Sequence, residues 1–297
     1  MEKLLAVVSP TAVDRKDNLP DRIRGGLSVG SDRDVDLLVS GDRAEIDAAI
    51  RASASDGADR IVAIGGDGTV AAVASALAGG SLPLAIVPVG SGNVLAEALG
   101  IPLDREEALQ MARDGGDVRF IDAMRVNGRV AVVNAGVGIS SLTVRDVPHG
   151  AKLVFGRVAY VMTGVVKTMS SGASKFRVEI DGRERSLKAI EVSVVNAALT
   201  KEKPVFLFPD IHPDDGELDV LVVWAPSVPD FLRKVAEATL GQATLERNVQ
   251  WSRAQIRVVI DTDRELPVQA DGDVVGTTPA TIDVLPGAVG VIVPPGR

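Results

Sequence analysis

The chain of 297 residues is long enough for two domains, each with its own hydrophobic core. Its net charge of −8 argues against general nucleic-acid binding, and the lack of cysteine excludes disulfides and thiolate metal sites. No apolar run reaches the roughly 18 residues of a membrane-spanning helix, so we expect a cytoplasmic protein without a transmembrane segment.

The first 120 or so residues alternate between predicted strands and predicted helices. Short apolar runs predict strands at 4–8, 35–39, 60–64 and 84–87. Helical patterns follow these runs at 44–54, 70–77, 94–99 and 104–113. The last of these begins with Asp104, which is typical of a helix N-cap. Because strands that alternate with helices form parallel β-α-β units, we predict an α/β domain with helices on both faces of its sheet.

After about Phe120 the pattern changes to short strands joined by tight turns. Asn127-Gly128 separates two apolar runs and indicates a hairpin. The alternating run at 176–180 ends at a second turn pair, Asp181-Gly182. Further strand-like runs follow at 190–195, 218–223, 256–260 and 281–285. We therefore predict a β-rich, mostly antiparallel second domain, interrupted by helical insertions near 152–170 and 229–240.

The strongest chemical signal is the turn Gly65-Gly66-Asp67-Gly68-Thr69, which follows a predicted strand and opens a predicted helix. Glycines let a phosphate approach the backbone, the N–H groups donate to it, and the helix dipole favours its charge. An ordinary tight turn without a ligand is the alternative. The turn matches neither G-x-G-x-x-G nor the Walker pattern with its lysine, so those two phosphate sites are not supported.

A second turn of the same kind, Gly90-Ser91-Gly92-Asn93, ends the next strand and opens the next helix. In a parallel sheet both turns lie at the carboxyl edge, where such folds bind ligands. The adjacent pair of turns therefore indicates a polyphosphate ligand.

Three motifs stand in a characteristic order, at residues 65–69, 88–93 and 133–138. This order resembles the diacylglycerol kinase catalytic domain, which bacterial lipid kinases and sphingosine kinases share. The resemblance continues through 152–160, 214–219, 269–273 and 285–287, so it covers essentially the whole chain. NAD kinases and phosphofructokinases also carry a Gly-Gly-Asp-Gly turn, but the second motif favours the lipid kinases.

The resemblance implies an ATP-binding α/β domain at 1–122, with 286–297 packing back onto it, and a β-rich lipid-substrate domain at 123–285. It implies an enzyme that uses ATP and Mg²⁺ to phosphorylate a hydroxyl of a lipid such as diacylglycerol or a sphingoid base. Two alternatives stay open. One is a kinase of a soluble substrate, like the NAD kinases, and the other is a nucleotide- or lipid-binding relative without catalysis.

The resemblance also implies roles for single residues. The residues that would hold ATP are Gly65, Gly66, Asp67, Gly68, Thr69, Ser91, Gly92 and Asn93. Asp67 would also position the magnesium ion, and Ser40 would contact the nucleotide through its hydroxyl. Asp273 would be the general base that accepts the proton of the lipid hydroxyl. A plain hairpin turn at Asp271-Gly272 is the alternative for this last site.

The segment 210–219 is rich in carboxylates, namely Asp210, Asp214, Asp215, Glu217 and Asp219. Their spacing is not that of an EF-hand, and a solvated acidic loop is the simplest interpretation. In bacterial relatives this loop binds a structural magnesium ion. By position, Asp215 would supply its carboxylate, and His212 and Glu217 their backbone carbonyls.

The segment 147–178 has no acidic residue but five basic ones, Lys152, Arg157, Lys167, Lys175 and Arg177. A core-packed helix with a solvated basic face is one interpretation. The other is a surface that docks on anionic lipid, which would place the protein peripherally at the membrane. The oligomeric state stays open, and a homodimer is one expectation.

Several positions depart from the family pattern. Ser9 stands where relatives often have Asn, Val94 where they often have Asp, and Glu97 near a position that is often basic. At the base position, Asp273 is one methylene shorter than the usual Glu. These departures leave open which lipid is phosphorylated.

Overall fold

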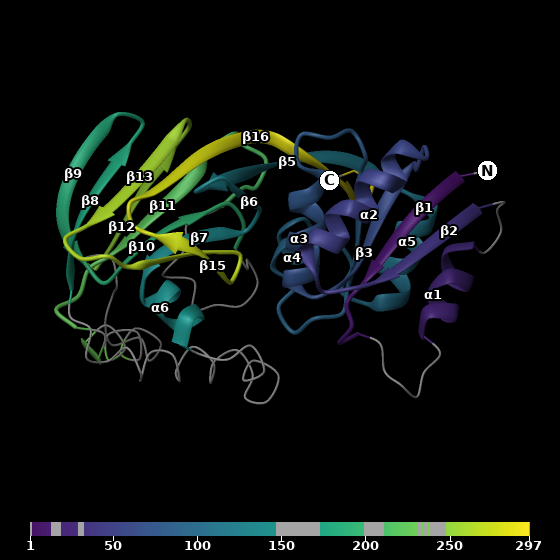
Figure 1. Ribbon diagram of the computed structural model, residues 1–297, viewed down its shortest axis with the longest axis horizontal. Coiled ribbons are helices and arrows are strands. Elements are labelled where there is room, and N and C mark those ends of the chain that lie inside the picture. Colours follow the sequence, from purple (N-terminus) through teal and green to yellow (C-terminus); the bar gives the residue numbers. More distant parts are fainter. Residues whose placement is uncertain are drawn as a thin grey trace. The chain divides into compact units, whose positions relative to one another are not determined.

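The computed structural model describes the residues 2–12, 19–28, 33–146, 173–198, 211–227, 229–230, 233, 237 and 248–296. The chain divides into two compact units (Figure 1). Unit 1 comprises Met1–Ala123 together with Pro286–Arg297, and unit 2 comprises Met124–Leu285. The helical insertion predicted near 152–170 lies outside the described residues, and so does most of the one predicted near 229–240.

Unit 1 is a parallel sheet flanked by helices. Its strands pair in the order β2 (Arg33–Val39), β1 (Glu2–Val8), β3 (Arg60–Gly65), β4 (Leu84–Pro88) and the last part of β16 (Ala280–Val293). The helices are α1 (Leu19–Ser28), α2 (Arg43–Ser55), α3 (Asp67–Leu77), α4 (Val94–Ala98) and α5 (Arg105–Asp114). Because α1 packs with α5 and α2 packs with α3, helices cover both faces of the sheet. The predicted α/β fold is confirmed.

The sequence explains these elements locally. Every residue of β4 is buried, as expected for a central parallel strand with helices on both sides. Val62 and Ile64 of β3 pack into one cluster with Ile23 and Leu27 of α1. The predicted N-cap is also present, because the Asp104 carboxylate accepts hydrogen bonds from the backbone N–H groups at the start of α5.

Unit 2 contains two antiparallel sets of strands. One sheet has the order β12 (Val249–Ala254), β11 (Leu218–Val223), β10 (Glu191–Val195), β7 (Asn134–Gly138), β14 (Pro267–Ala270) and β15 (Asp273–Thr277). The other has the order β16, β13 (Arg257–Thr262), β8 (Ser174–Ile180) and β9 (Arg183–Ala189). The strands β5 (Asp117–Val126) and β6 (Arg129–Ala131) form a hairpin. This hairpin belongs to the same sheet as β16, because β5 also pairs with β16. The helix α6 (Ile139–Asp146) packs on β7, β14 and β15.

The core of unit 2 lies between these two sets of strands. Val137 and Val192 reach it from one set, and Phe176 and Ile260 reach it from the other. Tight turns at 127–128, 181–182 and 271–272 have positive φ at both positions, which is the type I′ geometry of two-residue hairpins. The predicted β-rich, antiparallel architecture is therefore confirmed, and so are the two hairpins predicted from their turn pairs.

Two strands contribute residues to both units. β5 begins in unit 1 and continues into unit 2, and β16 returns from unit 2 to unit 1. Val291 of β16 pairs in parallel with Leu84 of β4, so the end of β16 completes the sheet of unit 1. Among the helices that the structure describes, none is long and apolar enough to cross a membrane.

Candidate active site

The two glycine turns of unit 1 contact each other through their backbones. A methyl group added at Gly90 would lie 2.6 Å from the Cα atom of Gly66, and one added at Gly66 would lie 3.3 Å from the Cα atom of Gly90. The N–H of Val89 also donates to the carbonyl of Gly65 (3.0 Å). The structure thus brings together the two motifs that the sequence places on neighbouring strands, and only glycine allows this close approach.

Asp67 connects the two turns. Its carboxylate accepts hydrogen bonds from the backbone N–H groups of Asn93 (3.0 Å) and Val94 (2.6 Å) at the start of α4. Asn93 has a left-handed backbone (φ 57°), and its side chain bonds the N–H and carbonyl of Gly90 rather than capping α4. Asp67 therefore supplies the cap that α4 otherwise lacks, and it carries a negative charge between the two turns.

The start of α3 borders open space. A methyl group at Gly68 would meet no atom within 4 Å. The first hydrogen bonds of this helix run from the N–H groups of Thr69 and Val70 to the carbonyl of Gly66. Ser91 at the tip of the second turn is exposed. A helix N-terminus beside glycines and an exposed hydroxyl can accept phosphate oxygens.

Ser40 follows β2 and is buried. Its hydroxyl donates to the carboxylate of Glu45 (2.6 Å) and accepts the N–H of Asp42 (3.0 Å). These bonds hold the start of α2. In this structure the hydroxyl predicted to contact the nucleotide therefore fixes the loop after β2.

A cavity of about 250 Å³ lies on the α1 and α5 side of the unit 1 sheet. Ile64, Val87 and Val89 line it from the ends of β3 and β4, and Ile23 and Leu109 line it from the helices. Its walls are mostly apolar, with Arg105 and Glu106 as the charged residues that line it.

The hairpin of β14 and β15 carries two carboxylates with different surroundings. Asp271 accepts hydrogen bonds from the backbone N–H groups of Val132, Val133 and Asn134, at 2.9, 2.9 and 3.0 Å. Asp273 is partly exposed, and its carboxylate pairs with the guanidinium of Arg129 (2.6 Å). Asp271 thus holds the hairpin to the backbone segment 132–134 that leads into β7, whereas Asp273 lies at a more accessible position.

Glu191 is a buried carboxylate that no sequence motif marks. It stands on β10 and accepts hydrogen bonds from the hydroxyls of Ser140 (2.5 Å) and Ser193 (2.6 Å) and from the N–H of Ser140 (2.9 Å). Burial raises the pKa of Glu191 to about 7, although the hydrogen bonds from the two serines favour the ionised form. The sequence signal is a single acidic residue within the predicted strand at 190–195.

The carboxylates and backbone carbonyls of the acidic loop are oxygen ligands of the kind that Mg²⁺ prefers. The Asp215 carboxylate accepts the N–H of Glu217 (3.0 Å), and the Glu217 carboxylate bonds Gln255 (2.6 Å) and Arg253 (3.0 Å). The hydrogen bond from Gln255 lowers the pKa of Glu217, whereas burial raises the pKa of Asp219. Within the described ranges no three side chains of His, Cys, Asp or Glu converge as a metal site. Backbone carbonyls would have to complete any ligand set here, and Asp210 lies outside the described residues.

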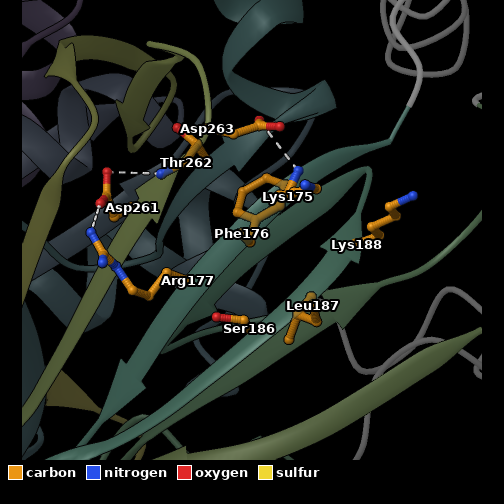
Figure 2. A pocket seen from close by; sticks show the side chains of 9 residues that line it. All are labelled: Lys175, Phe176, Arg177, Ser186, Leu187, Lys188, Asp261, Thr262 and Asp263. Carbon is orange, nitrogen blue, oxygen red and sulfur yellow. Dashed lines mark hydrogen bonds and ion pairs between the residues drawn. The ribbon is translucent and has the colours of Figure 1, made fainter.

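A second hollow, of about 540 Å³, lies over β8, β9 and β13. Figure 2 shows Lys175 and Lys188 at its sides, and it shows Arg177 turned toward Asp261. The ion pair between Arg177 and Asp261 neutralises one cation of the predicted basic segment. Residues 147–172 of that segment lie outside the described residues, and none of the predicted ATP or base residues lines this hollow.

The comparisons with known proteins cover both units. Residues 4–126 match the diacylglycerol kinase catalytic domain, and residues 131–293 match the YegS C-terminal NAD kinase beta sandwich-like domain. The chain is 30% identical to a diacylglycerol kinase of Bacillus subtilis, over 80% of this chain and 78% of that one. It is also 30% identical to a Pseudomonas aeruginosa protein named "Probable lipid kinase YegS-like", over 80% and 77% of the two chains.

A solved structure of a diacylglycerol kinase from Bacillus anthracis has the same fold. It superposes with a TM-score of 0.72 and covers 98% of this chain and 97% of that one, at 23% identity. The fold, the order of the motifs and the two matching domains agree. This chain therefore belongs to the family of diacylglycerol kinases and YegS-like lipid kinases.

Proposed function

We propose that this protein transfers the γ-phosphate of ATP, with the help of Mg²⁺, to a hydroxyl of a lipid such as diacylglycerol or a sphingoid base. The observation that carries the proposal is the contact between Gly66 and Gly90, which joins two phosphate-type turns at one sheet edge. Family membership supports ATP as the phosphate donor and a lipid as the acceptor. The comparisons give no support to a soluble substrate or to a non-catalytic role over this one.

The turns of unit 1 would hold the phosphates. Backbone N–H groups at the start of α3 and the hydroxyl of Ser91 would donate to the phosphate oxygens, and the remaining residues of this set are Gly65, Gly66, Gly68, Thr69, Gly92 and Asn93. Ser40 would act through the loop that its hydroxyl fixes.

The charge of Asp67 supports a role for magnesium. A carboxylate beside a polyphosphate repels it unless a cation lies between them. Bound Mg²⁺ would neutralise the phosphate charge as the transfer proceeds. Asp67, held by two backbone N–H groups, has a fixed position from which to take part in binding that ion.

A second magnesium ion would have a structural role in the acidic loop. Oxygen donors suit this hard cation, and the loop holds the carboxylate of Asp215 next to Gly216 at positive φ. The carbonyls of His212 and Glu217 would complete the protein ligands. Because the side chain of Glu217 is engaged with Arg253 and Gln255, only its backbone is proposed as a ligand.

Asp273 would be the general base. Its carboxylate oxygen would accept the proton that the lipid hydroxyl loses as the oxygen attacks the γ-phosphorus. Arg129 orients this carboxylate through a bond of 2.6 Å. Asp271 cannot take the role without giving up the three backbone N–H groups that it holds.

The test is transfer of labelled phosphate from ATP to diacylglycerols, phosphatidylglycerol, ceramides and sphingoid bases, each presented in vesicles with Mg²⁺. Asp273→Asn should lower kcat on the best lipid by a factor on the order of 100 or more and leave the KM for ATP nearly unchanged. Asp283→Asn is the matched control, because Asp283 also pairs with an arginine in unit 2 but lies on β16. A parallel reaction offers NAD as a soluble acceptor. Label in NAD but in no lipid would refute the lipid substrate, and ATP binding without transfer to any acceptor would refute catalysis.

A further inference from the structure

Three polar side chains from different elements meet above Gly136 of β7. A methyl group at Gly136 would lie 2.7 Å from Oε1 of Glu191 and 3.2 Å from Nε2 of Gln269, and it would collide with Oγ of Ser140. The three side chains come from β10, β14 and the first turn of α6. Glu191 and Gln269 are buried, at 7% and 5% exposure. Gly136 therefore leaves the space in which this buried polar cluster forms.

The carboxylate of Glu191 joins α6 to β10. It accepts both the hydroxyl and the backbone N–H of Ser140, so it lies at the N-terminus of α6, where the helix dipole favours a negative charge. The hydroxyl of Ser193 gives it a third hydrogen bond. These N–H and O–H donors suit the ionised carboxylate, and the backbone N–H of Ile139 also favours it.

Gln269 connects the same cluster to the hairpin of Asp273. Its side-chain carbonyl accepts the N–H of Gly272 (3.1 Å), and its amide donates to Oδ1 of Asn134 (2.8 Å). Gly272 is the residue before Asp273. In addition, α6 packs directly on β14 and β15, the two strands of this hairpin. The helix that Glu191 holds at its first turn therefore packs on the two strands that flank the turn before Asp273.

We propose that Glu191 is a positioning residue: its carboxylate fixes the start of α6, and because α6 packs on β14 and β15 it places the Asp273 hairpin for proton transfer. The proposal rests on the proposed role of Asp273. It assigns Glu191 no contact with substrate. Its function is to hold the base in place.

The charged groups around the cluster are distant or turned to solvent, as far as the structure describes them. β7 and β14 contribute none, and Arg145 of α6 is exposed. Glu191 lies opposite Val223 of β11, and Asp219 and its partner Arg253 stand four positions further along, at roughly 13 Å. Burial and the serine hydrogen bonds therefore govern the ionisation of Glu191, which loses its charge as the pH falls through about 7.

The first experiment measures kcat against pH from 5.5 to 9. In the parent protein kcat should fall toward acid with an apparent pKa of about 7. Glu191→Gln should lower kcat at pH 8 on the order of tenfold, leave the KM for ATP unchanged and remove that acid limb. Ser140→Ala removes the hydrogen bonds of its hydroxyl, so the limb should move to higher pH. Glu184→Gln, on the exposed surface of β9, is the matched control and should keep the parent profile.

The second experiment needs no turnover. The amide signal of Gly272, assigned in glycine-labelled protein with a Gly272→Asn variant, should titrate near pH 7 in the parent and not in Glu191→Gln. The two outcomes can be told apart. If the protein phosphorylates no lipid, the proposed function is refuted, but a Gly272 signal that titrates only in the parent protein would still support the coupling of Glu191 to the hairpin. An acid limb that persists in Glu191→Gln, or a Gly272 signal that titrates equally in both proteins, would overturn the proposal.

Discussion

The two units hold their key carboxylates by different means. In unit 1, Asp67 is fixed by the backbone, because it accepts two N–H groups of a neighbouring glycine turn. In unit 2, side chains hold Asp273 and its hairpin: Arg129 pairs with the Asp273 carboxylate, Gln269 bonds the N–H of Gly272 beside it, and α6, which Glu191 holds, packs on both strands. The backbone N–H donors of unit 1 keep one protonation state, whereas the network in unit 2 contains Glu191, whose pKa burial raises to about 7. Unit 1 should therefore be sensitive to added volume at its turns, and unit 2 should be sensitive to pH.

The largest expected effect is on the pH dependence of stability. The pKa of Glu191 is about 7 in the folded protein and 4.5 as the ordinary value, so the folded state binds more protons between these two limits. The free energy of unfolding should then fall as the pH rises from about 4.5 to about 7, on the order of 3 kcal/mol for this group. Urea unfolding at pH 5 and pH 8 measures it. The fall should be smaller in Glu191→Gln by that amount, and equal falls in both proteins would contradict the prediction.

The next effect tests the contact between the turns of unit 1. Gly90→Ala places a methyl group 2.6 Å from the Cα atom of Gly66, so the turns must separate. A displacement of about 1 Å at a catalytic site can lower turnover on the order of 100-fold, and we expect a loss of this size together with weaker ATP binding. Gly25→Ala is the matched control, because a methyl group there meets no atom within 4 Å. Equal activity of the two variants would show that the close approach is dispensable.

A smaller effect separates the two carboxylates of the unit 2 hairpin. Asp271→Asn weakens three hydrogen bonds from backbone N–H groups, so stability should fall by about 2 kcal/mol. Asp273→Asn changes one partly exposed ion pair, and its stability should change by less than about 1 kcal/mol. Chemical denaturation of both variants checks this. A larger loss for Asp273→Asn would reverse the structural and catalytic roles given to them.

The smallest effect concerns the acidic loop. If Asp215 binds structural magnesium, a concentration of Mg²⁺ about ten times its Kd adds about 1.4 kcal/mol, which corresponds to a rise in Tm of roughly 3–5 °C. Chelation should remove this rise in the parent protein but not in Asp215→Asn, which lacks the rise from the start. Asp214→Asn, a neighbour in the same loop, serves as the control. The same response to chelation in all three proteins would argue against an ion at Asp215.

Much of the fold follows from local patterns. The strands of unit 1 are apolar runs between helices, and the type I′ turns are marked by Asn-Gly and Asp-Gly pairs. The helix α1 is not predictable in this way, because Leu19–Ser28 contains a proline and two glycines that oppose helix formation. It forms because Ile23 and Leu27 bury against the sheet, and tertiary packing of this kind outweighs weak propensity.

The partners within the site are less accessible to sequence reasoning. The motifs identify Asp67 and Asp273, but their partners are 26 and 144 positions away in the chain. No local pattern encodes these distances. Glu191 is overlooked for a related reason: within the run at 190–195 its neighbours predict a strand, and only the fold shows that its side chain faces α6.

The path of β16 has a consequence for how the protein folds during its synthesis. Residues 286–293 complete the sheet of unit 1, yet the ribosome makes them after the whole of unit 2. Domains usually fold in the order in which they emerge, but here the first unit must wait for a strand that follows the second unit in the sequence. Until then β4 presents an unpaired edge, so the nascent chain should depend on unit 2 folding promptly, or on a chaperone, to avoid aggregation.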